Sequence, residues 1–378
     1  MEELDELKDK MSDDAYLMLC DASKEKYERL AREEKEKYDR LSREERAEQG
    51  EEQGEEDDEE EEDEEDEEPP YPIVAGRATI PEGETTICED AFLCCSSLES
   101  VTIPHSVTTI GNGAFRECTS LASITIPSSV TYIGDGAFLY CSSLTSVTIP
   151  SSVTNIGVEA FYGCSSITSV AIPSSVTEIG DNVFFDCSSL ESVTIPSSVT
   201  EIGHGAFDCS SLESVTIPSS VTKIGSCAFR YCPFTSITIP PSVTEIGNDA
   251  FFGCSSLTSV IIPNLVTKIG DSAFHHCSSI TSVEIPSSVT EIGHCAFYGC
   301  SSLKSVTIPS SVTEIGKYAF QNCYSLTSVT IPDSVRRLGE DAFLNCSSLT
   351  EVRCSHLDPT TLPSIFGSRT RARSRSIG

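Results

Sequence analysis

The middle of the chain repeats one pattern of apolar and polar positions about every 23 residues. An Ile-Pro pair marks each copy, at positions 80/81, 103/104, 126/127, 149/150, 172/173, 195/196, 217/218, 239/240, 262/263, 285/286, 308/309 and 331/332. Two steps are of 22 residues, because one residue is missing before Cys209 and another near Pro233. Such a fixed period is typical of solenoids, in which each unit buries its apolar face only against neighbouring units.

Each copy predicts two extended pieces and one helical turn. In residues 144–149 the spacing Leu-x-x-Val-x-Ile indicates a short strand with one buried face, and the following proline ends it because proline cannot donate to a sheet. Val-Thr-x-Ile-Gly predicts a second extended piece. We expect the next residue to be the N-cap of a helical turn that carries Ala-Phe-x-x-Cys. Five copies have a favourable residue there: Asn112, Asp135, Asp181, Asn248 and Asp271.

The apolar positions form columns that run through all copies. Phe and Cys occupy their columns in all twelve units, from Phe92 and Cys95 to Phe343 and Cys346. About eight apolar groups per unit, each stabilising by roughly 1–3 kcal/mol when buried, are enough for a stacked core. We therefore predict an α/β repeat solenoid over residues 71–356, with twelve units of 22–23 residues, short strands and single helical turns.

This unit resembles the BspA-like leucine-rich repeat family, whose pattern is L-x-x-I-x-I-P-x-x-V-x-x-I-G-x-x-A-F-x-x-C-x-x-L. The resemblance covers residues 80–353, about three quarters of the chain. It implies a solenoid used for adhesion or protein binding, with no ligand common to the family. Family members are often secreted or surface-anchored, whereas the N-terminus here has neither the basic start nor the apolar stretch of a secretory signal. We therefore expect an intracellular protein, in the cytoplasm or the nucleus, with mostly reduced cysteines.

The outward columns of the longer strand are the candidate binding surface. One column is Ser in eleven units, and the other is mostly Thr: Thr102, Thr125, Thr148, Thr194, Thr216, Thr238, Thr307 and Thr330. The columns are either a solvated strand surface or a binding surface for a protein partner. In the second case specificity comes from the departures, which are Glu191, Glu213, Ile261, Glu284, Lys304 and Arg353. A further exposed column alternates in sign from Glu178 to Arg337 and predicts weak ion pairs between repeats.

Charge is concentrated at the N-terminus. Residues 1–70 contain 33 Asp and Glu against 11 Lys and Arg. We expect a charged helical segment over residues 1–47 and a disordered acidic linker over 48–70, which favours basic partners and disfavours DNA and anionic membranes. No stretch is apolar enough to span a membrane. Residues 357–378 are predicted to contain the C-terminal cap and a flexible basic tail.

Residues 16–38 also resemble the C-terminal part of an HMG box, and the acidic run that follows is similar to the tails of HMG-box proteins. The first helix and the basic, wedge-bearing arm of that box are missing, and Tyr16 replaces its tryptophan. DNA bending is therefore not expected. The alternative function is that of a chromatin- or histone-associated acidic protein that acts through residues 1–70.

The remaining residues give little indication of catalysis, cofactor binding or metal binding. Hydroxyl groups recur without a recurring His or Asp partner, so we expect no enzyme and no cofactor. Zinc sites need close cysteine pairs of the C-x-x-C type, which the chain lacks. The one cluster with ligand chemistry is His275, His276, His294 and Cys295, which we interpret as structural. Six cysteines outside the repeat column are candidates for exposed, oxidisable thiols: Cys20, Cys88, Cys94, Cys227, Cys295 and Cys354.

Overall fold

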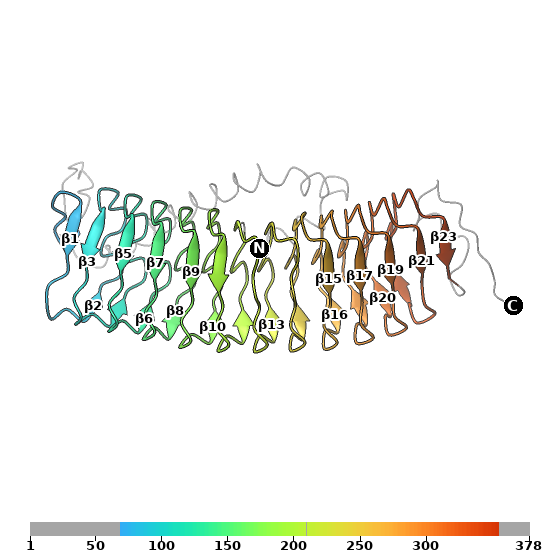
Figure 1. Ribbon diagram of the computed structural model, residues 1–378, viewed down its shortest axis with the longest axis horizontal. Helices are drawn as coiled ribbons and strands as arrows, with labels where there is room; N and C mark the ends of the chain where they lie inside the picture. Colours follow the sequence, from blue (N-terminus) through green and yellow to red (C-terminus); the bar gives the residue numbers. More distant parts are fainter. Residues whose placement is uncertain (1–68, 209, 355–378) are drawn as a thin grey trace, which may run out of the picture. The chain divides into compact units, whose positions relative to one another are not determined.

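A computed structural model describes residues 69–208 and 210–354, which form a β-solenoid of stacked coils (Figure 1). The coils contribute strands to two parallel arrays, each interrupted along its length, which we call the first sheet and the second sheet. The first sheet contains three-residue strands: β1 (Arg77–Thr79), β3 (Ser100–Thr102), β5 (Ser123–Thr125), β7 (Ser146–Thr148), β9 (Ser169–Ala171), β11 (Ser192–Thr194), β15 (Ser259–Ile261), β17 (Ser282–Glu284), β19 (Ser305–Thr307), β21 (Ser328–Thr330) and β23 (Glu351–Arg353). The second contains two-residue strands: β2 (Thr86–Ile87), β4 (Thr109–Ile110), β6 (Tyr132–Ile133), β8 (Asn155–Ile156), β10 (Glu178–Ile179), β12 (Glu201–Ile202), β13 (Lys223–Ile224), β14 (Glu245–Ile246), β16 (Lys268–Ile269), β18 (Glu291–Ile292), β20 (Glu314–Ile315) and β22 (Arg337–Leu338).

A ladder of phenylalanine rings forms the centre of the core. The twelve repeat phenylalanines, from Phe92 to Phe343, stack in eleven successive pairs with ring centroids 5.1–5.7 Å apart and interplanar angles of 4–12°. All twelve of these side chains are completely buried. At the N-terminal end the ring of Tyr71 lies 5.6 Å from that of Phe92 and continues the ladder. The predicted apolar columns are therefore confirmed as packing.

The predicted helical turn is wrong, since residues 69–208 and 210–354 contain no helix. In every coil whose turn is fully described, two positions adopt left-handed backbone conformations that interrupt the expected helical turn. In one coil these are Gly136, with φ of 56°, and Tyr140, also with φ of 56°. Only three residues lie between them, and the chain forms tight turns instead, with Leu139 N donating to Gly136 O at 2.9 Å. Left-handed residues end helices, so an i to i−4 ladder cannot form here.

The expected N-cap residues have a different partner. Instead of bonding within their own turn, they accept a backbone hydrogen bond from the next coil, as Asn112 Oδ1 does from Asp135 N at 3.0 Å. Asp135 Oδ1 accepts in turn from Val158 N at 2.8 Å. The repeat glycine permits this close approach, because a Cβ at Gly134 would lie 2.6 Å from Asn112 N. The Asn and Asp residues therefore join coils and do not begin helices.

The two 22-residue steps both shorten the turn that precedes the first sheet. In the first, Ser210 stands where the other coils have cysteine, with its Oγ 3.3 Å from Cys232 Sγ; Cys209 lies outside the described residues. The prediction that cysteine fills this column in all twelve units is therefore wrong. In the second, only Pro233 lies between Cys232 and the buried Phe234. Both coils lack a first-sheet strand, over residues 214–216 and 236–238, while the second sheet continues past them through β12, β13 and β14.

Several predictions concern residues outside the described ranges. These are the charged helical segment, nearly all of the acidic linker, the region that resembles an HMG box, Cys20, and the C-terminal cap and tail. The domain boundaries predicted from the sequence stay predictions.

Candidate binding surface

The outward columns of the first sheet form a continuous exposed surface. All fourteen candidate residues on this surface are exposed: Thr102, Thr125, Thr148, Thr194, Thr216, Thr238, Thr307, Thr330, Glu191, Glu213, Ile261, Glu284, Lys304 and Arg353. The side chains alternate along each strand, so the outward residues are exposed while the apolar residue at the strand centre, usually valine, points into the core. The first sheet is not continuous, however: strand pairing is interrupted between β3 and β5, between β7 and β9, and between β11 and β15.

Only some of the residues that depart from the Ser and Thr pattern lie next to one another. The pairing of β15 with β17 places Ile261 directly beside Glu284, and that of β17 with β19 places Glu284 beside Thr307. The side chain of Ile261 is 69% exposed, which is high for a large apolar residue on a sheet. At the C-terminal end, Arg353 is paired with Glu351 at 2.9 Å within β23. The structure therefore places an apolar and an acidic side chain next to each other in the C-terminal half of the surface.

The second sheet has a different chemistry, dominated by charge pairs between coils. Lys223 Nζ lies 2.9 Å from Glu201 Oε1, and Lys268 Nζ lies 2.7 Å from Glu291 Oε1. Arg337 pairs with Glu314 in the same way. The partner carboxylate raises the pKa of Lys223 and of Lys268. The ion pairs between repeats that the alternating column predicts are therefore confirmed, and their exposure limits each to below about 1 kcal/mol.

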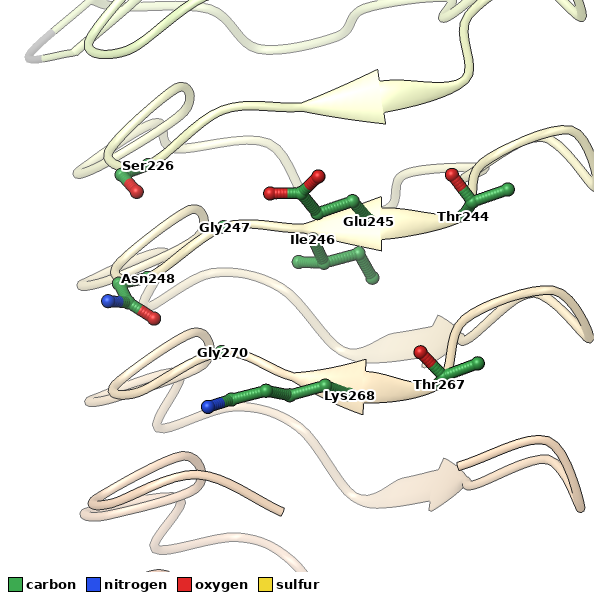
Figure 2. Close-up of a pocket in the computed structure, with 9 residues that line it drawn as sticks. All are labelled: Ser226, Thr244, Glu245, Ile246, Gly247, Asn248, Thr267, Lys268 and Gly270. Carbon is green, nitrogen blue, oxygen red and sulfur yellow. The ribbon is translucent and has the colours of Figure 1, made fainter. Parts of the chain in front are cut away.

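A shallow depression of about 290 Å³ lies between β14 and β16 (Figure 2). It exists because the hydrogen bond that joins successive threonines in most coils, such as Thr244 N to Thr222 O at 2.8 Å, is absent between Thr267 and Thr244. Figure 2 shows that the side chains of Glu245 and Lys268 do not point toward one another across it. The remaining lining consists of Ile246 and of hydroxyl, amide and glycine groups. Its shape and chemistry suit water or a small polar molecule and provide no catalytic arrangement.

The histidine cluster is structural. The imidazole of His275 lies between the rings of Phe252 and Tyr298, with both centroid distances 4.5 Å and both interplanar angles at most 6°. Burial lowers the pKa of His275 well below its usual value, so the ring is neutral. His294 Nδ1 accepts a hydrogen bond from Lys317 N at 3.0 Å. In the described part of the chain no three His, Cys, Asp or Glu side chains are grouped to hold a metal ion.

The repeat cysteines have a role that the sequence pattern did not reveal. Each thiol donates to the carbonyl oxygen of the phenylalanine in the preceding coil, as Cys141 Sγ does to Phe115 O at 3.0 Å. The other bonds of this kind run from Cys118, Cys164, Cys187, Cys232, Cys254, Cys277, Cys300, Cys323 and Cys346, at 3.1–3.4 Å. Burial raises the pKa of Cys141 to about 12, so this thiol stays protonated.

The cysteines outside the repeat column, all of which were expected to be exposed, differ in their burial. Cys88 and Cys94 are exposed and Cys354 is partly buried. Cys227 and Cys295 are buried, so the prediction is wrong for these two. Both occupy the first left-handed position of their coils, with φ of 56° and 52°.

One buried ion pair was not predicted. Asp208 is completely buried, and Arg230 in the next coil contacts its Oδ2 through Nε at 2.7 Å and through Nη2 at 2.6 Å. Both follow the ladder phenylalanine directly, at the position of Phe185, Phe252 and Tyr298 in other coils. The sequence does contain a signal for this pair. In a column that is otherwise rich in aromatic residues, these are the two successive units that carry opposite charges.

Comparisons with known proteins agree with this architecture. The sequence model described as BspA type Leucine rich repeat region (6 copies) matches residues 77–191, 133–258, 178–288 and 267–365. The crystal structure of a leucine-rich repeat protein from Bacteroides ovatus is similar, with 29% identity and a TM-score of 0.58, over 79% of this chain and 91% of that one.

A leucine rich cell surface protein from Faecalibacterium prausnitzii is 34% identical, with a TM-score of 0.55, over 77% of this chain and 90% of that one. No curated protein matches the sequence. In the described part of the chain there is no helix of the length and apolarity that a membrane span requires.

Proposed function

Because this chain belongs to the family of BspA-type leucine-rich repeat proteins, we propose that it is a non-enzymatic scaffold that binds a protein partner along the first sheet. The observation that carries the proposal is the exposed pair Ile261 and Glu284 on adjacent strands of that sheet. A solenoid presents an extended surface whose backbone is the same in every coil, so binding specificity depends on the side chains that differ.

The chemistry around Ile261 favours a partner segment with an apolar side chain next to a basic one. An apolar residue that leaves water at a contact stabilises it by roughly 25 cal/mol for each Å² buried. The carboxylate of Glu284 lies beside that contact, where a basic group satisfies it and an acidic group is repelled. The hydroxyl groups around the pair, such as that of Thr307, contribute directional hydrogen bonds at the rim.

Two variants of the full chain test this proposal. Ile261→Asp introduces a charge where the proposed contact needs an apolar group, and we expect it to lose the partners that the wild-type chain captures from cell extract. Leu265→Ser is the matched control, because Leu265 is another exposed apolar residue of the same coil, 54% exposed, at a position that is serine in most repeats. It should retain the partners.

Salt dependence separates this proposal from the alternative function of residues 1–70. Partners held by an acidic segment are basic and dissociate as salt screens the charges. If every captured partner is basic, dissociates at high salt and is indifferent to Ile261→Asp, the first sheet is not the binding surface. The expected intracellular location stays a prediction.

A further inference from the structure

At one step along the solenoid, both sheets are interrupted together. The first sheet lacks pairing between β7 and β9, and the second lacks pairing between β8 and β10, which belong to the same two coils. At the other first-sheet interruptions of the described chain the second sheet stays paired, as β4 with β6 and β14 with β16. We call the step from the coil of β7 and β8 to the coil of β9 and β10 the seam.

Cross-coil hydrogen bonds that recur elsewhere are also absent at the seam. Thr154 donates to Thr131 O through both N and Oγ1, at 2.9 and 3.3 Å, but Thr177 makes neither bond to Thr154. Gly134 N donates to Ile110 O at 2.9 Å, whereas Gly180 N has no such bond to Ile156. The step from β14 to β16 lacks the equivalent bonds of Thr267 and Gly270, but there Ile246 and Ile269 remain paired. The missing bonds lie on the side of the coil that carries the two sheets.

Contacts at the opposite corner of the coil remain. Across the seam, Glu159 N donates to Asp181 O and Phe161 N to Val183 O, both at 3.0 Å. Cys187 Sγ still donates to Phe161 O at 3.2 Å, and the rings of Phe161 and Phe184 stack at 5.5 Å. On the open side one cross-coil bond persists, from Ser175 Oγ to Val153 O. The two coils therefore stay in contact at the corner that carries the phenylalanine ladder, which we call the phenylalanine corner. Few hydrogen bonds join them along the two sheets.

Two substitutions within the repeat explain the opening. Val183 is the single residue other than alanine in the alanine column. A Cβ added at Gly180 would have Val183 Cγ2 as its nearest neighbour, at 3.6 Å, whereas a Cβ added at the other repeat glycines would lie closer than 3.0 Å to backbone of the preceding coil. Val158 stands in the column of Asn112 and Asp135, so it has no oxygen to accept the N–H of Asp181. One residue separates the coils and the other removes the bond that would hold them together.

We infer that the seam is a hinge about which the solenoid bends, with the phenylalanine corner as its axis. The two blocks that it joins are residues 77–168 and residues 169–354. Few sheet hydrogen bonds cross the seam. Besides the Ser175 contact, Glu191 N and Ser192 N donate to Thr168 O, at 2.9 and 3.3 Å, at the edge of the first sheet, so opening the seam breaks few bonds and leaves the stacked rings in place. Bending changes the separation of Thr148 and Ala171, so the two parts of the first sheet adjust to a bound surface independently.

Paired spin labels test the hinge in the full chain. One pair, at Ser123 and Ser236, spans five coil steps that include the seam. The control pair, at Ser214 and Ser328, also spans five steps but not the seam. It includes the step from β14 to β16, where the first sheet is interrupted but the second sheet stays paired. Five steps correspond to about 24 Å. The labels are attached to encoded keto side chains, because Cys88 and Cys94 are exposed and would react with thiol reagents. We expect a distance distribution at least twofold broader for the pair that spans the seam, and equal widths would overturn the inference.

Repair of the seam provides the matched variant. Val158→Asp with Val183→Ala restores the residues that the other coils carry, and we expect it to narrow the broad distribution to the control width. Amide exchange of the wild-type chain is an independent measurement that requires no variant. We expect the amides of Thr177 and Gly180 to exchange at least tenfold faster than those of Thr131 and Gly134, and equal protection would contradict the hinge.

Discussion

The buried ion pair between Asp208 and Arg230 allows the most direct calculation of an energetic effect. Asp208→Asn removes the negative charge but keeps the size of the side chain. The guanidinium of Arg230, 9% exposed at its side chain and in contact with Asp208 at 2.6 Å, is then left in the core region without its counter-charge. Breaking a buried pair in this way costs about 3–5 kcal/mol. We expect the free energy of unfolding in urea to fall by that amount.

An exposed ion pair in the same two coils is the matched control. Glu201 and Lys223 are 2.9 Å apart, but their side chains are 41% and 42% exposed. Glu201→Gln should therefore cost no more than about 1 kcal/mol. The double variant Asp208→Leu with Arg230→Met removes both buried charges and should recover most of the stability lost by Asp208→Asn. Equal losses for Asp208→Asn and Glu201→Gln would refute the reasoning that burial determines the cost.

Three further predictions concern the coil contacts and the buried titratable groups. Gly134→Ala should destabilise the chain by about 1–3 kcal/mol in urea unfolding, because the added Cβ would lie 2.6 Å from Asn112 N. Gly180→Ala should have little effect, because the Cβ added there would have its nearest neighbour at 3.6 Å. Burial raises the pKa of Cys141 and Cys232 to about 12 from 9.0, so the unfolded chain loses these protons at lower pH than the folded chain, and the free energy of unfolding should fall as pH rises from 9 to 12. A constant free energy of unfolding over that range would be evidence against protonated thiols at these two positions. Burial also lowers the pKa of His275 below 6.5, so at acidic pH the unfolded chain binds a proton there that the folded chain does not. The free energy of unfolding should therefore decrease as pH falls below 6.5, and it should decrease less steeply in His275→Phe.

Much of the fold is visible in the sequence because one unit recurs twelve times. The columns of Phe92, Leu98 and their equivalents identify the core, and the outward threonines identify an exposed sheet surface. The period also locates the two shortened coils, though only the structure shows that Ser210 takes the position of cysteine in the first of them.

The helical turn was mispredicted because the pattern of side chains does not report backbone dihedral angles. Ala137-Phe138 lies between two left-handed residues, and one of them, Tyr140, is of a type that rarely adopts that conformation. The Asn and Asp residues favour helix starts when considered within one unit. Their actual hydrogen bonds are to the next coil, which a single repeat cannot reveal.

The candidate surface depends on differences between copies, and those differences have several causes. Val183 and Val158 depart from the pattern as visibly as Ile261, yet they alter the packing between coils. Ile261 and Glu284 depart from it at exposed positions with no packing role. Only burial and strand register distinguish the two kinds of departure.

Photocrosslinking from one position on each sheet tests the proposed binding surface most directly. A photoreactive residue at position 261 lies on the exposed side of the first sheet, and one at position 155 lies on the exposed side of the second. If the chain binds its partner along the first sheet, position 261 should crosslink to that partner and position 155 should not. Crosslinking from position 155 alone, or equally from both positions, would contradict the account.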